Sequence, residues 1–178
     1  MLETNRLFLR PLTENDVDAV FAMRSDADVM RFIRPVQTNR SEAKSWIDLV
    51  SSRWEKEKIG FCAVIEKSSN RFIGWCGLWR LKENNEIEVG YALIKDFRGQ
   101  GLAVEAAAAL LKYGFEDLNL KEIVAVARPG NRASWRVMER LGMTYDYTGK
   151  FYDSDLVHYS ISREEFAARG SETKSAAD

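Results

Sequence analysis

The chain has 178 residues, 46% of them hydrophobic and 30% charged, with a net charge of -1. These values suit an ordinary soluble globular protein with one core, and they give no electrostatic reason to expect nucleic acid or an anionic membrane as a partner. No apolar run approaches the roughly 20 residues of a membrane span, and the N-terminus has neither a signal core nor a transit-peptide composition. With one histidine and two cysteines, a zinc site is not expected, so we expect a cytoplasmic protein without a metal.

The first half of the chain predicts one strand, two helices and three further strands. The first strand ends at a proline. Thr13 is a good N-cap, with Asp16 three residues later, and it begins the first helix. Ser41 is predicted to cap a second helix, in which apolar residues recur at helical spacing. The predicted strands are residues 7–11, 60–66, 72–81 and 86–94.

The second half begins with a glycine-rich turn, which leads into an Ala/Leu-rich helix that ends near Asp117. Asn131 is expected to cap another helix, and Gly142 to end it. The predicted strands of this half are residues 120–127, 144–152 and 156–162. The small polar residues 167–178 are typical of a disordered tail. The order of elements predicts a single α+β domain over residues 1–166, with a mixed central sheet of about seven strands flanked by about four helices.

The glycine-rich turn, residues 97–101, predicts a binding site for a phosphate group. Gly99 and Gly101 let the backbone approach a ligand closely, and the first turn of the following helix presents N–H groups without intrahelical partners. A Walker-type loop would continue with Lys and Ser or Thr, and Leu102 and Ala103 stand there instead. A dinucleotide-binding turn would need a small residue at Val104.

Several motifs together indicate a family. The turn follows Glu88-Val89-Gly90-Tyr91 and reads Arg98-Gly99-x-Gly101-x-Ala103-x-Glu105-Ala106. This arrangement resembles the pyrophosphate loop of the GNAT superfamily of N-acetyltransferases. Further motifs stand in the family's order: Phe72-Ile73-Gly74-x-Cys76-Gly77-Leu78, Asn131-x-x-Ser134 and Leu141-Gly142-Met143. The set resembles the branch that contains the ribosomal-protein N-terminal (alanine/serine) acetyltransferases. Asp96 departs from it, since many members have Gln or Arg there.

This resemblance implies a GNAT-like fold, in which two parallel strands, here residues 86–94 and 120–127, splay apart. Acetyl-CoA is then the cosubstrate, and no metal takes part. Its pantetheine arm would pair with the exposed strand edge, and an N–H near Leu93 or Ile94 would face the thioester carbonyl. The residues expected to bind acetyl-CoA are Leu93, Ile94, Arg98, Gly99, Gln100, Gly101, Leu102, Ala103, Asn131 and Ser134.

Glu88 and Ser134 are the predicted catalytic residues. Glu88 lies on a strand beside the splay and matches the acidic position before Gly-Tyr in the related branch, so it is the first candidate for the general base. It could instead only hold a helix or an arginine in place. Glu86, Asp153 and Asp155 remain alternatives, although aspartates in a turn commonly only form the turn.

The resemblance makes Ser134 the proton donor to the leaving thiolate, although a serine at a helix start can also simply bind backbone N–H groups. Many relatives use a tyrosine for this role, but the nearby residue here is Trp135. His158 matches no motif.

The predicted function is an acetyl-CoA-dependent N-acetyltransferase that acts by direct attack of a primary amine in a ternary complex. The acceptor can be a protein N-terminal amino group or a small amine such as an antibiotic, polyamine or amino acid. Deprotonating an α-amino group of pKa ~8 costs about 1 kcal/mol at neutral pH, against about 4–5 kcal/mol for lysine. Other acyl-CoA donors, a non-catalytic acyl-CoA sensor and a nucleotide-binding regulator stay open, as does a homodimer. The acceptor site is expected near Met30, Phe32, Arg34 and Tyr152.

Overall fold

The computed structural model describes residues 1–175, and residues 176–178 lie outside the described part. Within it, one mixed sheet has eight strands in the order β1-β2-β3-β4-β5-β6-β8-β7. The strands are β1 (Leu2–Glu3), β2 (Leu7–Pro11), β3 (Phe61–Glu66), β4 (Arg71–Arg80), β5 (Ile87–Leu93), β6 (Glu122–Ala127), β7 (Thr144–Phe151) and β8 (Ser154–Ser162). Neighbours are antiparallel except β5 and β6, which are parallel. The eighth strand is β1, a two-residue strand that the sequence did not predict.

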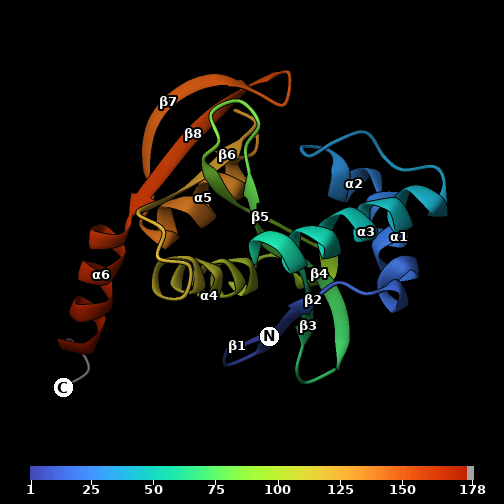
Figure 1. Cartoon of the computed structure of the whole chain (residues 1–178), viewed down its shortest axis with the longest axis horizontal. Helices are drawn as coiled ribbons and strands as arrows, with labels where there is room; N and C mark the ends of the chain where they lie inside the picture. The colour runs from blue at the N-terminus through green and yellow to red at the C-terminus, as the bar shows by residue number, and fades with distance from the viewer. Residues whose placement is uncertain (176–178) are drawn as a thin grey trace.

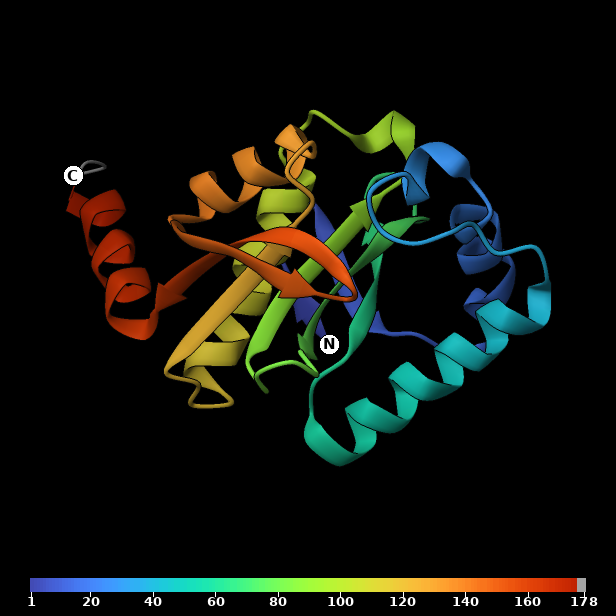
Figure 2. The same cartoon turned by 90° about the horizontal axis from the view of Figure 1, so that it is seen from above.

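Helices cover both faces of this sheet (Figures 1 and 2). They are α1 (Val17–Arg24), α2 (Ala27–Met30), α3 (Arg40–Glu57), α4 (Leu102–Glu116), α5 (Arg132–Leu141) and α6 (Arg163–Ser175), with 3-10 turns η1 (Glu14–Asp16) and η2 (Lys95–Phe97). The helices α1 to α3 lie on one side, which we call the α3 face, and α4 and α5 lie on the other, the α4 face. No helix among residues 1–175 is long and apolar enough to cross a membrane.

The register of β4 and β5 decides which side chains reach each face. Trp79 pairs with Glu88 and belongs with the aromatic residues of the α3 face. Cys76 pairs with Tyr91, which packs against the main core on the α4 face. Because successive side chains of a strand point to opposite faces, Glu88 and Tyr91 lie on opposite sides of the same strand.

The strands β5 and β6 diverge, as predicted. Their parallel pairing is limited to Glu88 with Val124, whereas β6 pairs with β8 along its whole length. The part of β5 that runs on to Leu93 therefore has no ladder partner on its β6 side among residues 1–175. Its backbone groups on that side are left to bind something else.

The starts of η1 and α3 can be compared with the predicted helix caps. Thr13 is the N-cap of η1, which leads directly into α1, and its N–H and hydroxyl donate to the carboxylate of Asp16 at 2.8 and 3.0 Å. Helix α3 begins one residue before Ser41, and its N-cap is Asn39, whose Oδ1 accepts the N–H of Ser41 at 2.9 Å. The prediction of Ser41 as the cap was wrong because Asn and Ser are about equally good caps, so residue type alone does not choose between them.

Helix α6 occupies most of the stretch that the sequence predicted to be a disordered tail. The helix runs from Arg163 through Ser175, and the predicted tail's last residues, 176–178, lie outside the described residues. Glu165 accepts hydrogen bonds from the N–H and hydroxyl of Ser162 at the start of this helix. The ring of Phe166 packs 5.2 Å from that of Phe115 on α4. These contacts tie the first turn of α6 to the domain.

Candidate active site

The glycine turn opens onto a cavity lined by α4 and α5 on one side and by α2 on the other. Gly99 and Gly101 have φ angles of +77° and +78°, a conformation that other residues rarely adopt, and helix α4 begins at the next residue, Leu102. A cavity of about 440 Å³, which we call the turn cavity, lies against this turn. Of the ten residues predicted to bind acetyl-CoA, eight line it: Leu93, Arg98, Gly99, Gly101, Leu102, Ala103, Asn131 and Ser134.

The other two residues, Ile94 and Gln100, make contacts within the protein. The N–H of Ile94 donates to the carbonyl of Ile73 on β4 at 2.9 Å. Gln100 donates its side-chain amide to the carbonyl of Asp96 at 2.9 Å. Because N–H groups of successive strand residues point to opposite neighbours, the N–H of Leu93 faces β6 across the divergence. Of the two backbone donors that were considered, Leu93 is therefore the one that points into the gap.

Arg98 anchors the turn to its surroundings. Its Nε donates to the carbonyl of Leu93 at 2.9 Å, and its Nη1 pairs with Asp28 of α2 at 2.7 Å. Two further arginines that were not predicted, Arg136 and Arg140 of α5, are exposed and line the turn cavity. They are one helical turn apart and add positive charge to a cavity that already has a helix N-terminus.

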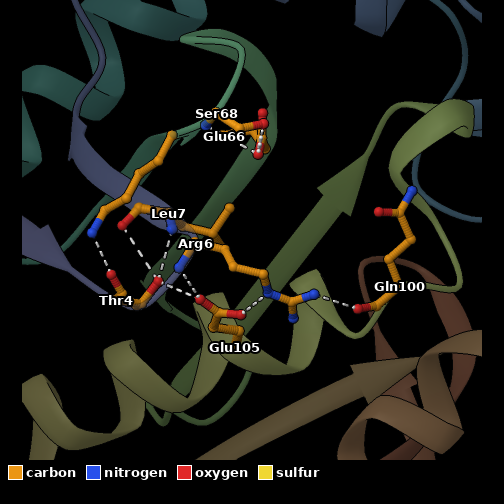
Figure 3. Close-up of polar contacts among 8 residues, drawn as sticks. Thr4, Arg6, Leu7, Glu66, Ser68, Gln100 and Glu105 are labelled. Atoms are coloured by element: carbon orange, nitrogen blue, oxygen red, sulfur yellow. Dashed lines mark hydrogen bonds and ion pairs between the residues drawn. The ribbon is translucent and has the colours of Figure 1, made fainter.

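Glu105, in the first turn of α4, fastens the glycine turn to the N-terminal segment (Figure 3). Its carboxylate accepts hydrogen bonds from the hydroxyl of Thr4 at 2.6 Å and from the backbone N–H of Arg6 at 2.8 Å. Arg6 also pairs with it through Nε at 2.7 Å and donates Nη1 to the carbonyl of Gln100 at 3.0 Å. Burial raises the pKa of Glu105, but the hydrogen bonds from Thr4 and Arg6 outweigh this and hold the pKa below its usual value. The carboxylate therefore stays charged and holds the turn in place.

A second cavity of about 490 Å³ lies on the α3 face. We call it the aromatic cavity, because its walls include Phe32, Trp46, Phe61, Trp75, Trp79 and Tyr152. Phe61 stacks on Trp79 with ring centroids 5.7 Å apart, and Trp46 meets Trp75 edge-on at 5.4 Å. Three of the four residues that were expected near an acceptor, Phe32, Arg34 and Tyr152, line this cavity. The fourth, Met30, is 1% exposed and belongs to the core.

Glu88 reaches the aromatic cavity from β5. Its side chain is buried, with the residue 7% exposed, and it accepts a short hydrogen bond from the hydroxyl of Tyr152. Burial raises the pKa of Glu88 to about 7, although the Tyr152 hydrogen bond and the charge of Arg34 oppose this. A carboxylate with such a pKa can accept a proton at neutral pH and release it again.

The two cavities adjoin, and five residues line both of them: Phe32, Ile33, Tyr91, Asn131 and Ser134. Tyr91 and Ser134 supply the hydroxyl groups of this junction. The hydroxyl of Tyr91 donates to the carbonyl of Ser134 at 3.1 Å and lies 3.0 Å from its Oγ. Asn131 caps α5 as predicted, accepting the N–H of Ser134 at 3.3 Å. Burial raises the pKa of Tyr91, so its hydroxyl keeps its proton at neutral pH. The Tyr91–Ser134 pair, a candidate proton donor, thus lies on the opposite side of β5 from the carboxylate of Glu88.

Sequence reasoning missed Tyr91 as a partner of Ser134. The residue next to Ser134 in the chain is Trp135, whereas the tyrosine that contacts Ser134 comes from β5. The signal was present in Glu88-Val89-Gly90-Tyr91: strand alternation places the two ionisable side chains on opposite faces. The position of α5 over Tyr91 depends on tertiary packing.

The remaining acidic candidates have other partners. Glu86 binds Nε2 of His158 at 2.9 Å, and Asp146 binds its Nδ1 at 2.9 Å. His158 is 3% exposed, and its ring stacks on Tyr147 at 4.6 Å. This pairing ties the start of β5 to β7 and β8.

The two aspartates of the last hairpin differ in position. Asp155 pairs with Lys150 at 3.0 Å, and both side chains are exposed. Asp153 does line the aromatic cavity, from a turn position with φ of 58°. Of the four acidic candidates, Glu88 and Asp153 therefore face this cavity, and Glu88 is the buried one.

Comparisons with known proteins identify acetyltransferases that share this fold. A family model described as an Acetyltransferase (GNAT) domain matches residues 6–144. The N-acetyltransferase p20 of Bacillus licheniformis, described as uncharacterized, is 30% identical over 174 residues, covering 93% of this chain and 98% of that protein. A crystal structure of an acetyltransferase from Agrobacterium tumefaciens strain C58 is 28% identical, with a TM-score of 0.81 over 90% of this chain and 92% of that one. RimL, a ribosomal L7/L12 alpha-N-protein acetyltransferase solved in complex with coenzyme A, has the same fold, with a TM-score of 0.77 over 89% of this chain and 95% of its own at 19% identity.

Proposed function

The chain belongs to the GNAT family and is an N-acetyltransferase, and from this premise we propose that it transfers acetyl from acetyl-CoA to an α-amino group or an amine of similar pKa. The attack is direct, in a ternary complex. The meeting of the turn cavity and the aromatic cavity at Tyr91 and Ser134 is the observation that carries the proposal. Acetyl-CoA would enter from the glycine turn, and the amine from the side of Glu88.

The turn cavity supports a diphosphate group. The amides of the glycine turn and of the first turn of α4 act as donors at a helix N-terminus, and Arg136 and Arg140 supply positive charge at the same cavity. The free edge of β5, towards Leu93, offers backbone groups to a pantetheine arm. The residues present therefore suit acetyl-CoA.

Each chemical step has a residue that can carry it. Glu88 takes a proton from the amine, whose nitrogen forms a bond to the acetyl carbon while the carbon–sulfur bond breaks. The N–H of Leu93 faces the gap and stabilises the oxyanion between these events, and a donor of this kind is typically worth ~3–4 kcal/mol. The thiolate takes its proton from the Tyr91–Ser134 pair, which stands 3.0 Å apart at the junction.

The pKa of Glu88, about 7, supports an acceptor with an ordinary α-amino group. Such a group has a pKa of ~8, so proton transfer to Glu88 is uphill by about 1.4 kcal/mol. Transfer from a lysine-like amine of pKa ~10.4 is uphill by about 4–5 kcal/mol. This difference favours N-terminal or amino-acid amines over polyamines.

Replacing Glu105 by glutamine should weaken the hold on acetyl-CoA. The neutral amide cannot accept from Thr4 and Arg6 as a carboxylate does, so the glycine turn becomes less ordered before the donor binds. We expect KM for acetyl-CoA to rise about 5- to 10-fold with little change in kcat, measured by thiol release at a saturating amine concentration. Glu116→Gln is the matched control, since Glu116 is on the same helix, its side chain is 62% exposed, and it forms a surface ion pair with Lys112 at 3.8 Å. Equal changes in KM for both variants would contradict the role given to Glu105.

The proposed function is tested by thiol release from acetyl-CoA over a panel of amines and peptides with free Ser, Ala and Met N-termini. We expect turnover with at least one α-amino acceptor, and stabilisation by coenzyme A but not by ATP in a thermal-shift measurement. Binding of acetyl-CoA without turnover on any amine would indicate an acyl-CoA sensor. Stabilisation by ATP alone would indicate a nucleotide-binding regulator, and faster turnover with succinyl-CoA would indicate a different acyl donor.

A further inference from the structure

The aromatic cavity contains a buried cation that has no anionic partner among the residues whose side chains the structure describes. Arg24, the last residue of α1, lines this cavity and is 7% exposed. Its guanidinium lies 4.4 Å from the ring centre of Trp46 and 5.7 Å from that of Trp75. The Nε atom is buried and has no hydrogen-bond partner among the residues that the structure describes. Burial and the nearby charge of Arg34 together lower the pKa of Arg24 to about 10. The side chain therefore remains protonated at neutral pH.

A buried arginine is ordinarily satisfied by a carboxylate. Among residues 1–169, whose side chains the structure describes, Arg24 forms no ion pair, and Glu42 raises its pKa only through charge at longer range. The indole rings supply a cation–π contact, but they cannot accept the N–H groups of the guanidinium in its plane. Arg24 therefore keeps unused hydrogen-bond donors at the cavity wall.

Other charged groups facing the cavity do not neutralise Arg24. Arg34 is exposed, lies 5.6 Å from the ring of Tyr152, and lowers the pKa of Arg24 through like charge. Arg128 also lines the cavity. The acidic groups there are Asp153 and Glu88, and burial keeps Glu88 partly protonated at neutral pH. Positive charge is thus in excess at a site that is expected to receive an amine.

We propose that the acceptor is an amine that also carries a carboxylate, which binds to Arg24 and Arg34 while the apolar part of the molecule lies against the indole rings. The inference rests on the proposed function, because it assigns the aromatic cavity to the acceptor. Guanidinium and carboxylate match in shape and form paired, charge-assisted hydrogen bonds. The same arginines repel a polycation, so the cavity selects against polyamines as well as for amino carboxylates.

A purely structural role for Arg24 makes a different prediction. The side chain stands at the C-terminal end of α1, where the helix dipole favours a cation, and its stem packs on tryptophan. If that were its whole role, replacing it would lower stability and affect every acceptor alike. A recognition role changes the ratio between acceptors that differ only in the carboxylate.

The experiment compares kcat/KM for phenylalanine and phenylalanine amide, and for Ser-terminal peptides with Asp or Asn as the second residue. The two pairs distinguish a free amino acid from an acidic N-terminus. The wild type should prefer the carboxylate member of at least one pair by about 100-fold, and Arg24→Met should reduce that ratio to about 1. Arg24→Lys should restore part of it. Arg40→Met is the matched control, because Arg40 pairs with Asp18 on the exposed surface, and both ratios should stay at their wild-type values.

A binding measurement separates this inference from the proposed function. Calorimetry should show that 3-phenylpropanoate binds the wild type at least tenfold more tightly than 3-phenylpropanol, and that Arg24→Met removes the difference. If no amine is acetylated but this difference is found, the proposed function fails and the carboxylate site stands. If amines are acetylated without any carboxylate preference and 3-phenylpropanoate binds no better than the alcohol, the inference is overturned and the function stands.

Discussion

Replacing Glu88 by glutamine should lower kcat by a factor of about 10²–10⁴, the usual contribution of a general base, and leave the dissociation constant of acetyl-CoA within about twofold. Glutamine keeps the size of the side chain and can still accept from Tyr152, but it cannot take a proton from the amine. The two effects separate because Glu88 lines the aromatic cavity and not the turn cavity. Steady-state kinetics and calorimetry with acetyl-CoA in the absence of an amine measure them independently.

The pH profile identifies Glu88 more specifically than the loss of activity does. Its pKa is about 7, and the base must be deprotonated to act, so kcat/KM should rise with pH through about 7 in the wild type. The Glu88→Gln variant should lose this limb. The control is Glu86→Gln, two residues earlier on the chain, where the carboxylate binds His158 instead. Should Glu86→Gln lose the limb and Glu88→Gln keep it, the base is Glu86.

The same pKa predicts that stability falls as pH rises, whereas activity increases. Glu88 has a folded-state pKa of about 7, above its value of about 4.3 in an unfolded chain. Between these values the folded protein keeps a proton that the unfolded chain has released, so the free energy of unfolding falls as pH rises. Glu88→Gln removes this effect. We expect the variant to match the wild type near pH 4.5 and to exceed it by about 3 kcal/mol at pH 8, measured by urea denaturation.

Removing the proton donor at the junction should have the second-largest effect. Tyr91→Phe and Ser134→Ala should each lower kcat by about 10²-fold, because the leaving thiolate then lacks its donor. The two hydroxyls are 3.0 Å apart, so they act as a unit, and the double variant should be about as slow as the slower single one.

Trp135→Phe is the control for this pair. Trp135 is next to Ser134 on α5, but its indole ring cannot supply an acidic proton. This variant should keep near wild-type turnover. If the reduction of kcat in the double variant equals the product of the two single reductions, Tyr91 and Ser134 act in separate steps. A wild-type rate in both single variants would move the proton donor elsewhere.

The glycine turn could be predicted from the sequence because its requirements are local. Gly99 and Gly101 supply the two positive φ angles, and α4 starts directly after them. The capping residues Thr13 and Asn131 were predicted for the same reason, since a cap is decided within three or four residues. Glu88 was chosen through the family resemblance, which implied a splay beside its strand and an acidic residue before Gly-Tyr.

The long-range partners could not be predicted in this way. Tyr91 comes to Ser134 from 43 positions away, and Tyr152 comes to Glu88 from 64. Arg24 shows nothing unusual in the sequence, where it reads as a cation in the last turn of a helix. Only the packing of α1 against α3 and β4 brings Arg24 to Trp46 and Trp75 and shows that its charge has no partner there.

The most direct test of the central claim is a crystal structure with bound coenzyme A. The diphosphate should accept hydrogen bonds from backbone amides of residues 99–103, and the pantetheine arm should run along the edge of β5 that faces β6, with its sulfur beside Ser134. A bound coenzyme A that leaves the glycine turn empty, or strands β5 and β6 that pair along their full length, would contradict the account.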